Sequence, residues 1–245
     1  MRPGLTNLAW DTDFFGFSVG KIEGEIQNPS QVSAVEQLFT TNGHELAYYS
    51  STKPLSKLVH DSHELDFVLV DRKTTYLKIV NPQLSIDSDI TSFIANSATD
   101  KLNDLAIQSG EYSRFNVDHR IEPEKFREMY KLWIANSLNK KMAREVQIYS
   151  SGTDIAGFVT LGEKNQRADI GIIGVDHSYR RNGIGRTLMQ SAEKWSYDHG
   201  YEFIQVVTQG DNYPACRLYE SCGYHVDRRE YFYHIWRKAS STVTR

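Results

Sequence analysis

The stretch Asp169-Ile-Gly-Ile-Ile-Gly-Val-Asp-His-Ser-Tyr-Arg-Arg-Asn-Gly-Ile-Gly-Arg-Thr-Leu-Met189 contains two different hydrophobic patterns. It begins with a short apolar run, rich in β-branched residues and ending at Val175, which is typical of a buried strand. Beyond the glycines, Leu188, Ala192 and Trp195 recur at helical spacing. The segment therefore predicts a strand, a polar loop and a helix in close succession.

The loop between strand and helix has the composition of an anion-binding turn. Gly183 and Gly185 allow the backbone to turn with positive φ and to approach a ligand without obstruction by Cβ. The helix start offers unpaired N–H groups and the positive end of the helix dipole, which favour an anionic pyrophosphate. Arg180, Arg181 and Arg186 add charge for phosphate oxygens. A tight turn with solvated arginines explains the same residues, so the motif alone leaves both interpretations open.

Strand and helix signals continue on both sides of this segment. Downstream, we expect a strand over 203–207, a helix over 215–221 that starts at 212–214 and stops at Gly223, and a strand over 231–236. Upstream, the runs 146–149 and 157–161 flank a turn at 150–154 and predict a hairpin. Pro123 opens a predicted amphipathic helix that extends to Leu138.

The first hundred residues resemble a worn copy of the later part of the chain. Residues 33–46 align with 191–203, and residues 70–73 align with 226–229 after a slip of one residue. The copy lacks the arginine-glycine loop, because residues 23–28 are acidic there and contain one glycine. We therefore predict a boundary near 103–110, with a cofactor-free domain over residues 1–108 and a cofactor-binding domain over residues 109–245.

Composition excludes several classes of partner. The 245 residues carry a formal net charge of −3, with both signs spread along the chain, which argues against nucleic-acid or anionic-membrane binding and favours a small partner. No run of signal-peptide or membrane-spanning length is present, so the cytoplasm is the expected location. Cys216 and Cys222 are expected to be reduced thiols, on different faces of one helix. His44, His60 and His63 lack metal-ligand spacing, and no metal is expected.

Residues from Val175 to Met189, followed by a strand, Asn212 and Ala215-x-x-Leu-Tyr-Glu-x-Cys-Gly-Tyr224, together resemble the acetyl-CoA signature of the GNAT superfamily. The resemblance implies an α/β fold, with a mixed, mostly antiparallel sheet flanked by helices, and an acetyltransferase that uses acetyl-CoA and no metal. It implies that Asn212 and Tyr219 face the thioester and that Tyr219 protonates the departing thiolate. It also implies a pantetheine and pyrophosphate site formed by Ile173, Gly174, Val175, Arg180, Arg181, Asn182, Gly183, Ile184, Gly185 and Arg186.

A narrower resemblance, to the dTDP-fucosamine acetyltransferase family, covers both halves of the chain. It rests on residues 8–11 and 14–16, 69–73, 112–115 and Ala192-x-x-Trp195. It implies a dTDP-linked 4-amino-4,6-dideoxy sugar as acceptor, a role in surface-polysaccharide synthesis, a contribution of the first half to the acceptor site, and a homodimer. The arginine-rich loop is fuller than that family's, which leaves the amino sugar open.

Several alternatives remain at this point. The acceptor can instead be a protein N-terminus, a polyamine or an antibiotic, and the chain can be a non-catalytic CoA-binding sensor. The presence of Tyr219 argues against a sensor, although its spacing alone is that of a core-facing aromatic. Glu163 and Asp169 lie near the expected amine site or are solvated strand ends. Trp10 and its neighbouring phenylalanines stack on a base or pack in the core, and Arg114 meets a diphosphate or packs at the surface.

Overall fold

The computed structural model of the protein describes residues 2–56, 62–80, 89–95 and 97–238. Contacts divide the chain into two compact units, Met1–Lys73 with Arg229–Arg245 and Thr74–Arg228. The expected boundary near 103–110 falls inside the second unit, because the chain enters that unit at Thr74 and leaves it only at Arg228. Two long strands, β4 (Leu65–Ile79) and β10 (His225–Arg237), contribute residues to both units.

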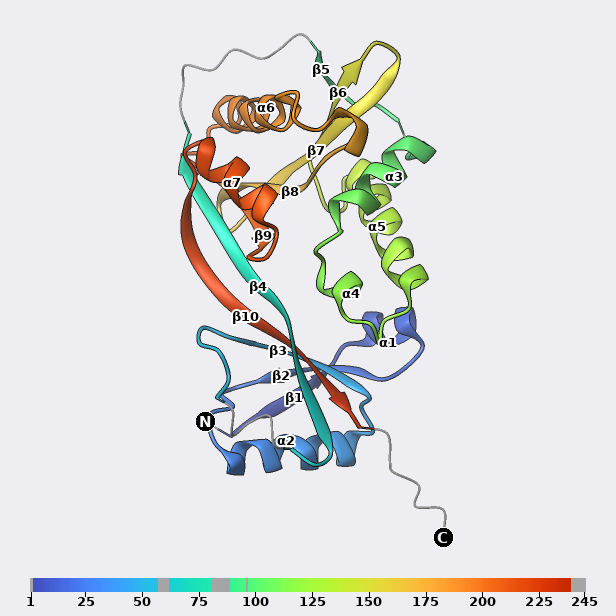
Figure 1. Cartoon of the computed structure of the whole chain (residues 1–245), viewed down its shortest axis with the longest axis vertical. Coiled ribbons are helices and arrows are strands. Elements are labelled where there is room, and N and C mark those ends of the chain that lie inside the picture. The colour runs from blue at the N-terminus through green and yellow to red at the C-terminus, as the bar shows by residue number, and fades with distance from the viewer. Residues whose placement is uncertain (1, 57–61, 81–88, 96, 239–245) are drawn as a thin grey trace. The chain divides into compact units, whose positions relative to one another are not determined.

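The first unit is built on the strand order β1-β2-β3-β10-β4 (Figure 1). Besides β4 and β10, its elements are β1 (Gly4–Asn7), α1 (Ala9–Phe15), β2 (Val19–Glu23), α2 (Pro29–Asn42) and β3 (Leu46–Ser51). Strands β2 and β3 pair in parallel, whereas β1 with β2 and β3 with β10 pair antiparallel. Helix α2 begins with Asn28 accepting a hydrogen bond from the Gln31 amide, and it packs Val35 and Phe39 into the core of this unit.

The second unit continues the strand order as β4-β9-β8-β7-β6-β5. Its elements are β5 (Ile90–Ser92), α3 (Asp100–Ser109), α4 (Arg114–Val117), α5 (Pro123–Leu138), β6 (Glu145–Ser151), β7 (Asp154–Lys164), β8 (Arg167–Val175), a 3-10 turn (His177–Tyr179), α6 (Ile184–Asp198), β9 (Phe203–Gln209) and α7 (Tyr213–Ser221). Strands β8 and β9 pair in parallel, and the pairs β5–β6, β6–β7 and β7–β8 are antiparallel. The predicted mixed, mostly antiparallel sheet is confirmed.

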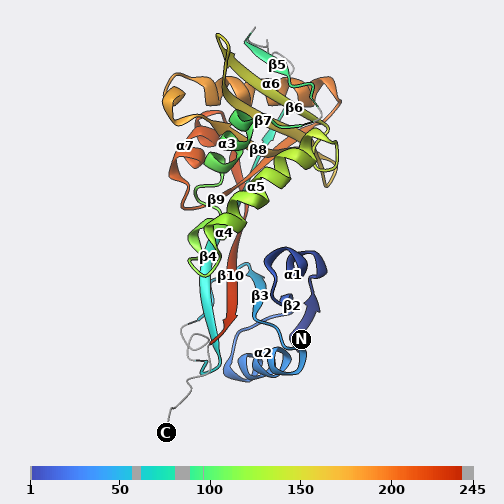
Figure 2. The same ribbon diagram turned by 90° about the vertical axis from the view of Figure 1, so that its right-hand side faces the viewer.

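Helices cover both faces of the sheet in the second unit (Figure 2). Helix α6 packs Leu188 and Ala192 against Val159 of β7 on one face, while α3 and α5 pack against Phe158 on the other. Adjacent residues of β7 point to opposite faces because side chains alternate along a strand. Burial of these apolar side chains holds α6 against the sheet.

Most predicted elements of the second unit are present. Helix α5 begins and ends at the predicted residues, and the hairpin β6–β7 turns at Gly152, which has a φ of 61°. Strand β10 is longer than predicted, because it begins at His225 rather than at Tyr231. The residues before Tyr231 are mostly exposed and charged, so an apolar pattern does not reveal them as a strand.

Each unit contains a strand, a helix and a second strand parallel to the first. These are β2, α2 and β3 in the first unit and β8, α6 and β9 in the second. The aligned segments 33–46 and 191–203 lie on corresponding elements of the two triplets. Among the residues that the structure describes, no helix is both long enough and apolar enough to pass through a membrane.

Candidate active site

A cavity of about 550 Å³ opens in the second unit. Its lining comes from the end of α3 and the turn after it, the end of β8, the loop into α6, the first residues of α6, and one side of α7. The lining residues are Gln108, Ser109, Glu111, Tyr112, Ile173, Gly174, Val175, Tyr179, Arg180, Arg181, Gly183, Ile184, Gly185, Arg186, Asn212, Pro214, Ala215, Leu218 and Tyr219. The structure thus brings all but one of the predicted site residues to one cavity.

The cavity lies where strands β8 and β9 separate. Their parallel ladder pairs Ala168 with Ile204 and ends where Ile170 pairs with Val206. The rest of β8, up to Val175, pairs only with β7 among the described strands. Apart from Val175 O, which accepts a hydrogen bond from Arg180 Nε, the β8 edge from Ile173 to Val175 therefore has backbone groups that can pair with an extended ligand.

The loop after β8 is anchored from three directions by Asp176. Its backbone N–H donates to Ala156 O at 2.9 Å, and its carboxylate accepts from the Ser178 amide at 2.8 Å and from Lys101 Nζ at 2.9 Å. The Lys101 hydrogen bond and those from Ser178 lower the pKa of Asp176 to about 2, against an opposing effect of burial. The Asp176 carboxylate is therefore ionised at neutral pH.

The start of α6 is suited to an anion. Arg181 and Gly183 have φ values of 67° and 83°, and no side chain caps the helix. A positive φ on a non-glycine residue costs energy and is concentrated at functional turns. A Cβ on Gly185 would come within 3.0 Å of Leu218 Cδ2, so helix α7 packs closely against this turn. The uncapped amides of the first turn can donate to phosphate oxygens.

The three arginines of the loop are held differently. Arg180 donates from Nε to Val175 O at 3.1 Å, and Arg186 donates to Ser221 O and Oγ at the end of α7. Both line the cavity, as does Arg181. Asn182 does not line it, because its side-chain amide turns back to Tyr179 O at 3.3 Å. Asn182 is thus the predicted residue that the structure leaves outside the cavity, although its backbone remains in the loop.

Asn212 and Tyr219 reach the cavity from α7. Asn212 caps the helix by accepting a hydrogen bond from the Ala215 amide at 3.2 Å. Tyr219 is buried, with its ring edge-on to Tyr76 at 5.6 Å, and burial raises the pKa of its phenol well above the usual value. Tyr219 is therefore a core residue and a cavity residue at once, and its phenol stays protonated at neutral pH.

Other candidates lie away from this cavity. Glu163 bonds to Arg144 and to Tyr201 Oη, and Asp169 accepts from Gln205, so these carboxylates are engaged elsewhere and neither lines the cavity. Both lie near the turn of the β7–β8 hairpin, which favours the alternative that they are strand-end residues. Arg114 stacks its guanidinium over the ring of Phe115, with 4.5 Å from Cζ to the ring centroid.

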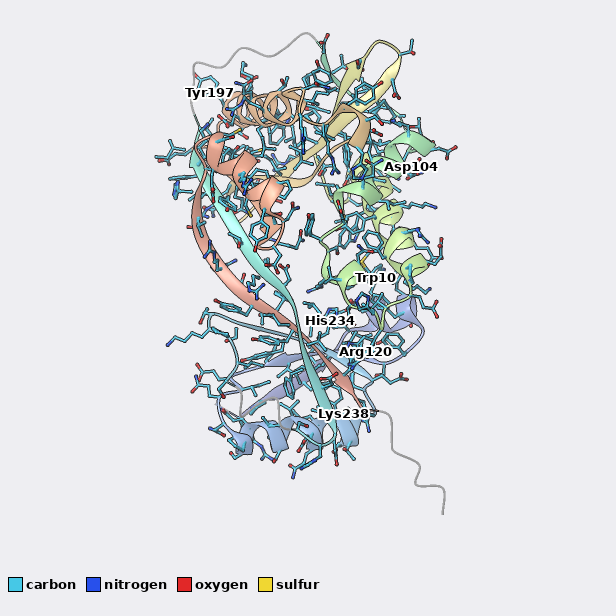
Figure 3. The ribbon with its side chains drawn as sticks, in the orientation of Figure 1. Trp10, Asp104, Arg120, Tyr197, His234 and Lys238 are labelled. Carbon is cyan, nitrogen blue, oxygen red and sulfur yellow. The ribbon has the colours of Figure 1, made fainter. Side chains whose placement is uncertain are left out.

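The aromatic cluster of the first unit, formed by Trp10, Phe14, Phe15 and Phe17, is only partly buried in the core. Trp10, labelled in Figure 3, is 50% exposed and stacks on Phe14 with ring centroids 5.0 Å apart. Phe15 is buried.

The described residues include no group of three or more His, Cys, Asp or Glu side chains suited to a metal ion. His60 lies outside the described residues, and the absence of a metal stays a prediction.

Sequence reasoning missed one side of the cavity. Gln108 and Ser109 belong to the last turn of α3 and Glu111 follows it, and no motif or periodicity marks a binding residue there. A Cβ on Gly174 would lie 3.3 Å from Ser109 Cβ, which shows how closely this segment approaches β8. The sequence contains one signal of this contact: Gly174 lies inside a predicted strand, where a glycine often marks the close approach of another segment.

The family model described as Acetyltransferase (GNAT) family matches residues 110–224, which cover every part of the cavity except Gln108 and Ser109. The chain carries a GNAT acetyltransferase domain. The protein is therefore an N-acetyltransferase. The GNAT assignment agrees with the strand order and with the uncapped helix after β8.

Relatives of the GNAT domain extend the likeness beyond it. The dTDP-fucosamine acetyltransferase of Escherichia coli O6:H1 is 27% identical over 236 residues, covering 95% of this chain and 98% of that protein. The spore coat polysaccharide biosynthesis protein SpsD of Bacillus subtilis is 23% identical over 138 residues, or 56% of this chain and 47% of that protein. A GCN5-related N-acetyltransferase from Sphaerobacter thermophilus has the same fold, with a TM-score of 0.58, 16% identity, and coverage of 95% of this chain and 76% of that chain.

Proposed function

We propose that the protein transfers an acetyl group from acetyl-CoA to the amine of a dTDP-linked 4-amino-4,6-dideoxy sugar used for surface polysaccharide. The observation that carries this proposal is the likeness to dTDP-fucosamine acetyltransferase, which runs over 95% of the chain and is therefore not confined to the GNAT domain. The likeness to a spore coat polysaccharide biosynthesis protein supports the same class of product.

The cavity fits the parts of acetyl-CoA. The free edge of β8 at Ile173, Gly174 and Val175 would pair with the amides of the pantetheine arm. The amides from Arg181 to Arg186, with the arginine side chains, would hold the pyrophosphate. The thioester supplies an activated acetyl carbonyl, whose developing charge β8 N–H groups near Val175 would stabilise.

The proposed reaction requires a proton donor for the departing thiolate, and Tyr219 is the candidate. An acceptor amine is protonated in water and must lose a proton before it attacks, and the departing sulfur must gain one. Tyr219 lines the cavity, and burial keeps its phenol protonated. It would therefore donate its proton to the sulfur, with Asn212 on the same helix beside the thioester.

The first unit enters the proposal as a degenerate copy without a phosphate loop. Its βαβ triplet corresponds to β8-α6-β9, and only residues 24–28 separate β2 from α2, whereas 176–183 separate β8 from α6. Three further points stay predictions: the protein forms a homodimer, it is located in the cytoplasm, and its first half contributes to the acceptor site.

The proposal is tested by acetyl-CoA turnover against a panel of dTDP- and UDP-linked amino sugars, measured as thiol release. We expect a dTDP-linked 4-amino sugar to have the highest kcat/KM. Peptide N-termini, polyamines and aminoglycoside-type antibiotics form the second panel. Efficient turnover there, with none on any nucleotide-linked sugar, would overturn the acceptor while leaving the acetyltransferase intact. Binding of acetyl-CoA with no acceptor turned over would instead indicate a sensor.

A further inference from the structure

The loop proposed to hold the pyrophosphate begins with a negative charge. Asp176 is the first residue after β8, and its side chain is only 10% exposed. The hydrogen bond from Lys101, and then those from Ser178, lower the pKa of Asp176 to about 2, so the carboxylate is charged at neutral pH. A fixed negative charge in an anion-binding loop repels the anion. The loop therefore depends on a cation that compensates Asp176.

Lys101 of helix α3 supplies a cation at this place. Its Nζ lies 2.9 Å from Asp176 Oδ2 and 3.4 Å from Asp154 Oδ2. It also lies 6.0 Å from the ring centroid of Tyr179, a loop residue that lines the cavity. The hydrogen bond with Asp176 raises the pKa of Lys101, so the ammonium group is charged at neutral pH. Lys101 itself does not line the cavity, and it reaches the loop through Asp176 and Tyr179.

Other contacts at the loop tether it without compensating the charge. Gln108 of α3 donates from Nε2 to Asp176 Oδ2 at 3.5 Å, and its Oε1 accepts from the His177 amide at 3.1 Å. The Asp176 carboxylate also accepts from the Ser178 amide at 2.8 Å. These partners are neutral, and Lys101 is the cation among them. The position of the loop and the balance of its charge thus depend on different residues.

The place of Lys101 in its own helix gives no reason for the positive charge. Lys101 is the second residue of α3, and a cation in the first turn is opposed by the positive end of the helix dipole. Its side chain is one-third exposed. A neutral residue at this position is therefore expected to leave α3 folded, and the charge of Lys101 acts on the loop.

We infer that Lys101 is a positioning residue for cofactor binding, whose ammonium group compensates the Asp176 carboxylate so that the loop after β8 can hold the pyrophosphate of acetyl-CoA. This inference rests on the proposed binding of acetyl-CoA at this loop and is independent of the acceptor. Because Lys101 acts through the charge of the loop, its effect should concern the pyrophosphate and spare the thioester end of the cofactor.

The test uses Lys101→Gln and two thioesters, acetyl-CoA and S-acetylpantetheine, which has the pantetheine arm and lacks the pyrophosphate. Glutamine can still donate a hydrogen bond to Asp176 but carries no charge. We expect the acetyl-CoA Kd to rise roughly fivefold or more at low salt, because the loop becomes more negative. The rise should shrink toward 1 M salt, where the Debye length is about 3 Å. Calorimetric titration measures this Kd, and displacement of acetyl-CoA measures that of S-acetylpantetheine, which should stay near the parent value.

Two further variants isolate the charge from the tether. Lys101→Arg keeps a cation and should bind acetyl-CoA about as tightly as the parent. Combining Lys101→Gln with Asp176→Asn removes both charges and should recover most of the affinity that Lys101→Gln loses.

Lys125→Gln is the matched control. Lys125 also lies in the first turn of a helix, is 32% exposed and pairs with a carboxylate, Glu128, at 3.4 Å, but it does not line the cavity. It should bind both thioesters like the parent. A folded Lys101→Gln that keeps its acetyl-CoA affinity, that loses both thioesters equally, or that Asp176→Asn does not rescue would overturn the inference. A parent that binds neither thioester would instead reject the proposed cofactor site.

Discussion

Tyr219 shows how one residue can satisfy two patterns. Its helical spacing predicts a core aromatic, and the structure does bury its ring against Tyr76 and Tyr224. The same side chain lines the cavity. Burial keeps the phenol protonated, so a proton is available in the cavity, but the raised pKa also makes the phenol a weaker acid toward a departing thiolate.

Replacing Tyr219 by Phe removes the hydroxyl and keeps the ring packing. If Tyr219 is the general acid, we expect kcat to fall by roughly 10²-fold or more, with little change in the acetyl-CoA Kd. Steady-state kinetics and calorimetry measure the two quantities. Tyr76→Phe is the control, since Tyr76 donates to Glu220 at 2.9 Å and does not line the cavity. Lower thermal stability with kcat nearly intact in Tyr219→Phe would assign the residue to the core alone.

At the residue scale, sequence motifs located one side of the cavity and not the other. Residues of β8, the loop and α7 were found because they lie in one contiguous signature with glycines and arginines. Gln108, at the end of α3, and Glu111, in the turn after it, precede that signature by many residues, and their place in the cavity depends on how α3 packs on β8. Local patterns carry no information on such packing, so only the folded structure reveals these residues.

At the element scale, the start of α6 is the part of the fold on which the proposed pyrophosphate binding depends. Gly183 has a φ of 83°, and a Cβ there would meet no atom within 4 Å. A side chain at this position therefore costs only the strain of positive φ, about 1–2 kcal/mol, and less for Asp than for most residues. We therefore expect a substitution at Gly183 to leave the packing of the second unit intact while its side chain faces the proposed pyrophosphate.

We predict that Gly183→Asp remains folded and loses acetyl-CoA affinity by more than tenfold. The new carboxylate would repel the pyrophosphate and cancel the favourable helix dipole. Calorimetric titration gives the Kd, and circular dichroism monitors folding. Gly152→Asp is a matched control, because Gly152 also has a positive φ, 61°, and open space around its Cβ position, but lies in the β6–β7 hairpin outside the cavity. A folded Gly183→Asp that binds within tenfold of the parent would reject the loop assignment.

Elements with strong local signals were predictable, and their long-range pairing was not. Helix α5 was placed from its apolar spacing and Pro123, and hairpin β6–β7 from its turn residues. Strand β10 instead pairs with β3, so that Tyr231 lies opposite Ser51 and Trp236 opposite Leu46. No local pattern links residues so far apart, which is why a boundary argued along the chain near 103–110 differs from the division that the contacts make.

At the scale of the whole molecule, stability should depend on the pH through His44. This side chain is 4% exposed, lies against Gly20, and has no hydrogen-bond partner on either ring nitrogen among the described residues. Burial, and then the charge of Arg237, lower its pKa below 6.5, so folding opposes protonation of this histidine. The neutral form's stability is fully present above the unfolded value of about 6.5 and is lost as the pH falls below it.

We therefore predict that the free energy of unfolding falls between pH 7.5 and pH 5.5, by at most about 1.4 kcal/mol per pH unit from this one group. His44→Leu should flatten that part of the profile, because the apolar side chain fills the same buried space without a titrating ring. Denaturant unfolding at several pH values measures the slope. His225→Gln, at an exposed histidine, is the control and should keep the parent slope. An equal slope in His44→Leu and the parent would show that other groups govern the acid sensitivity of the fold.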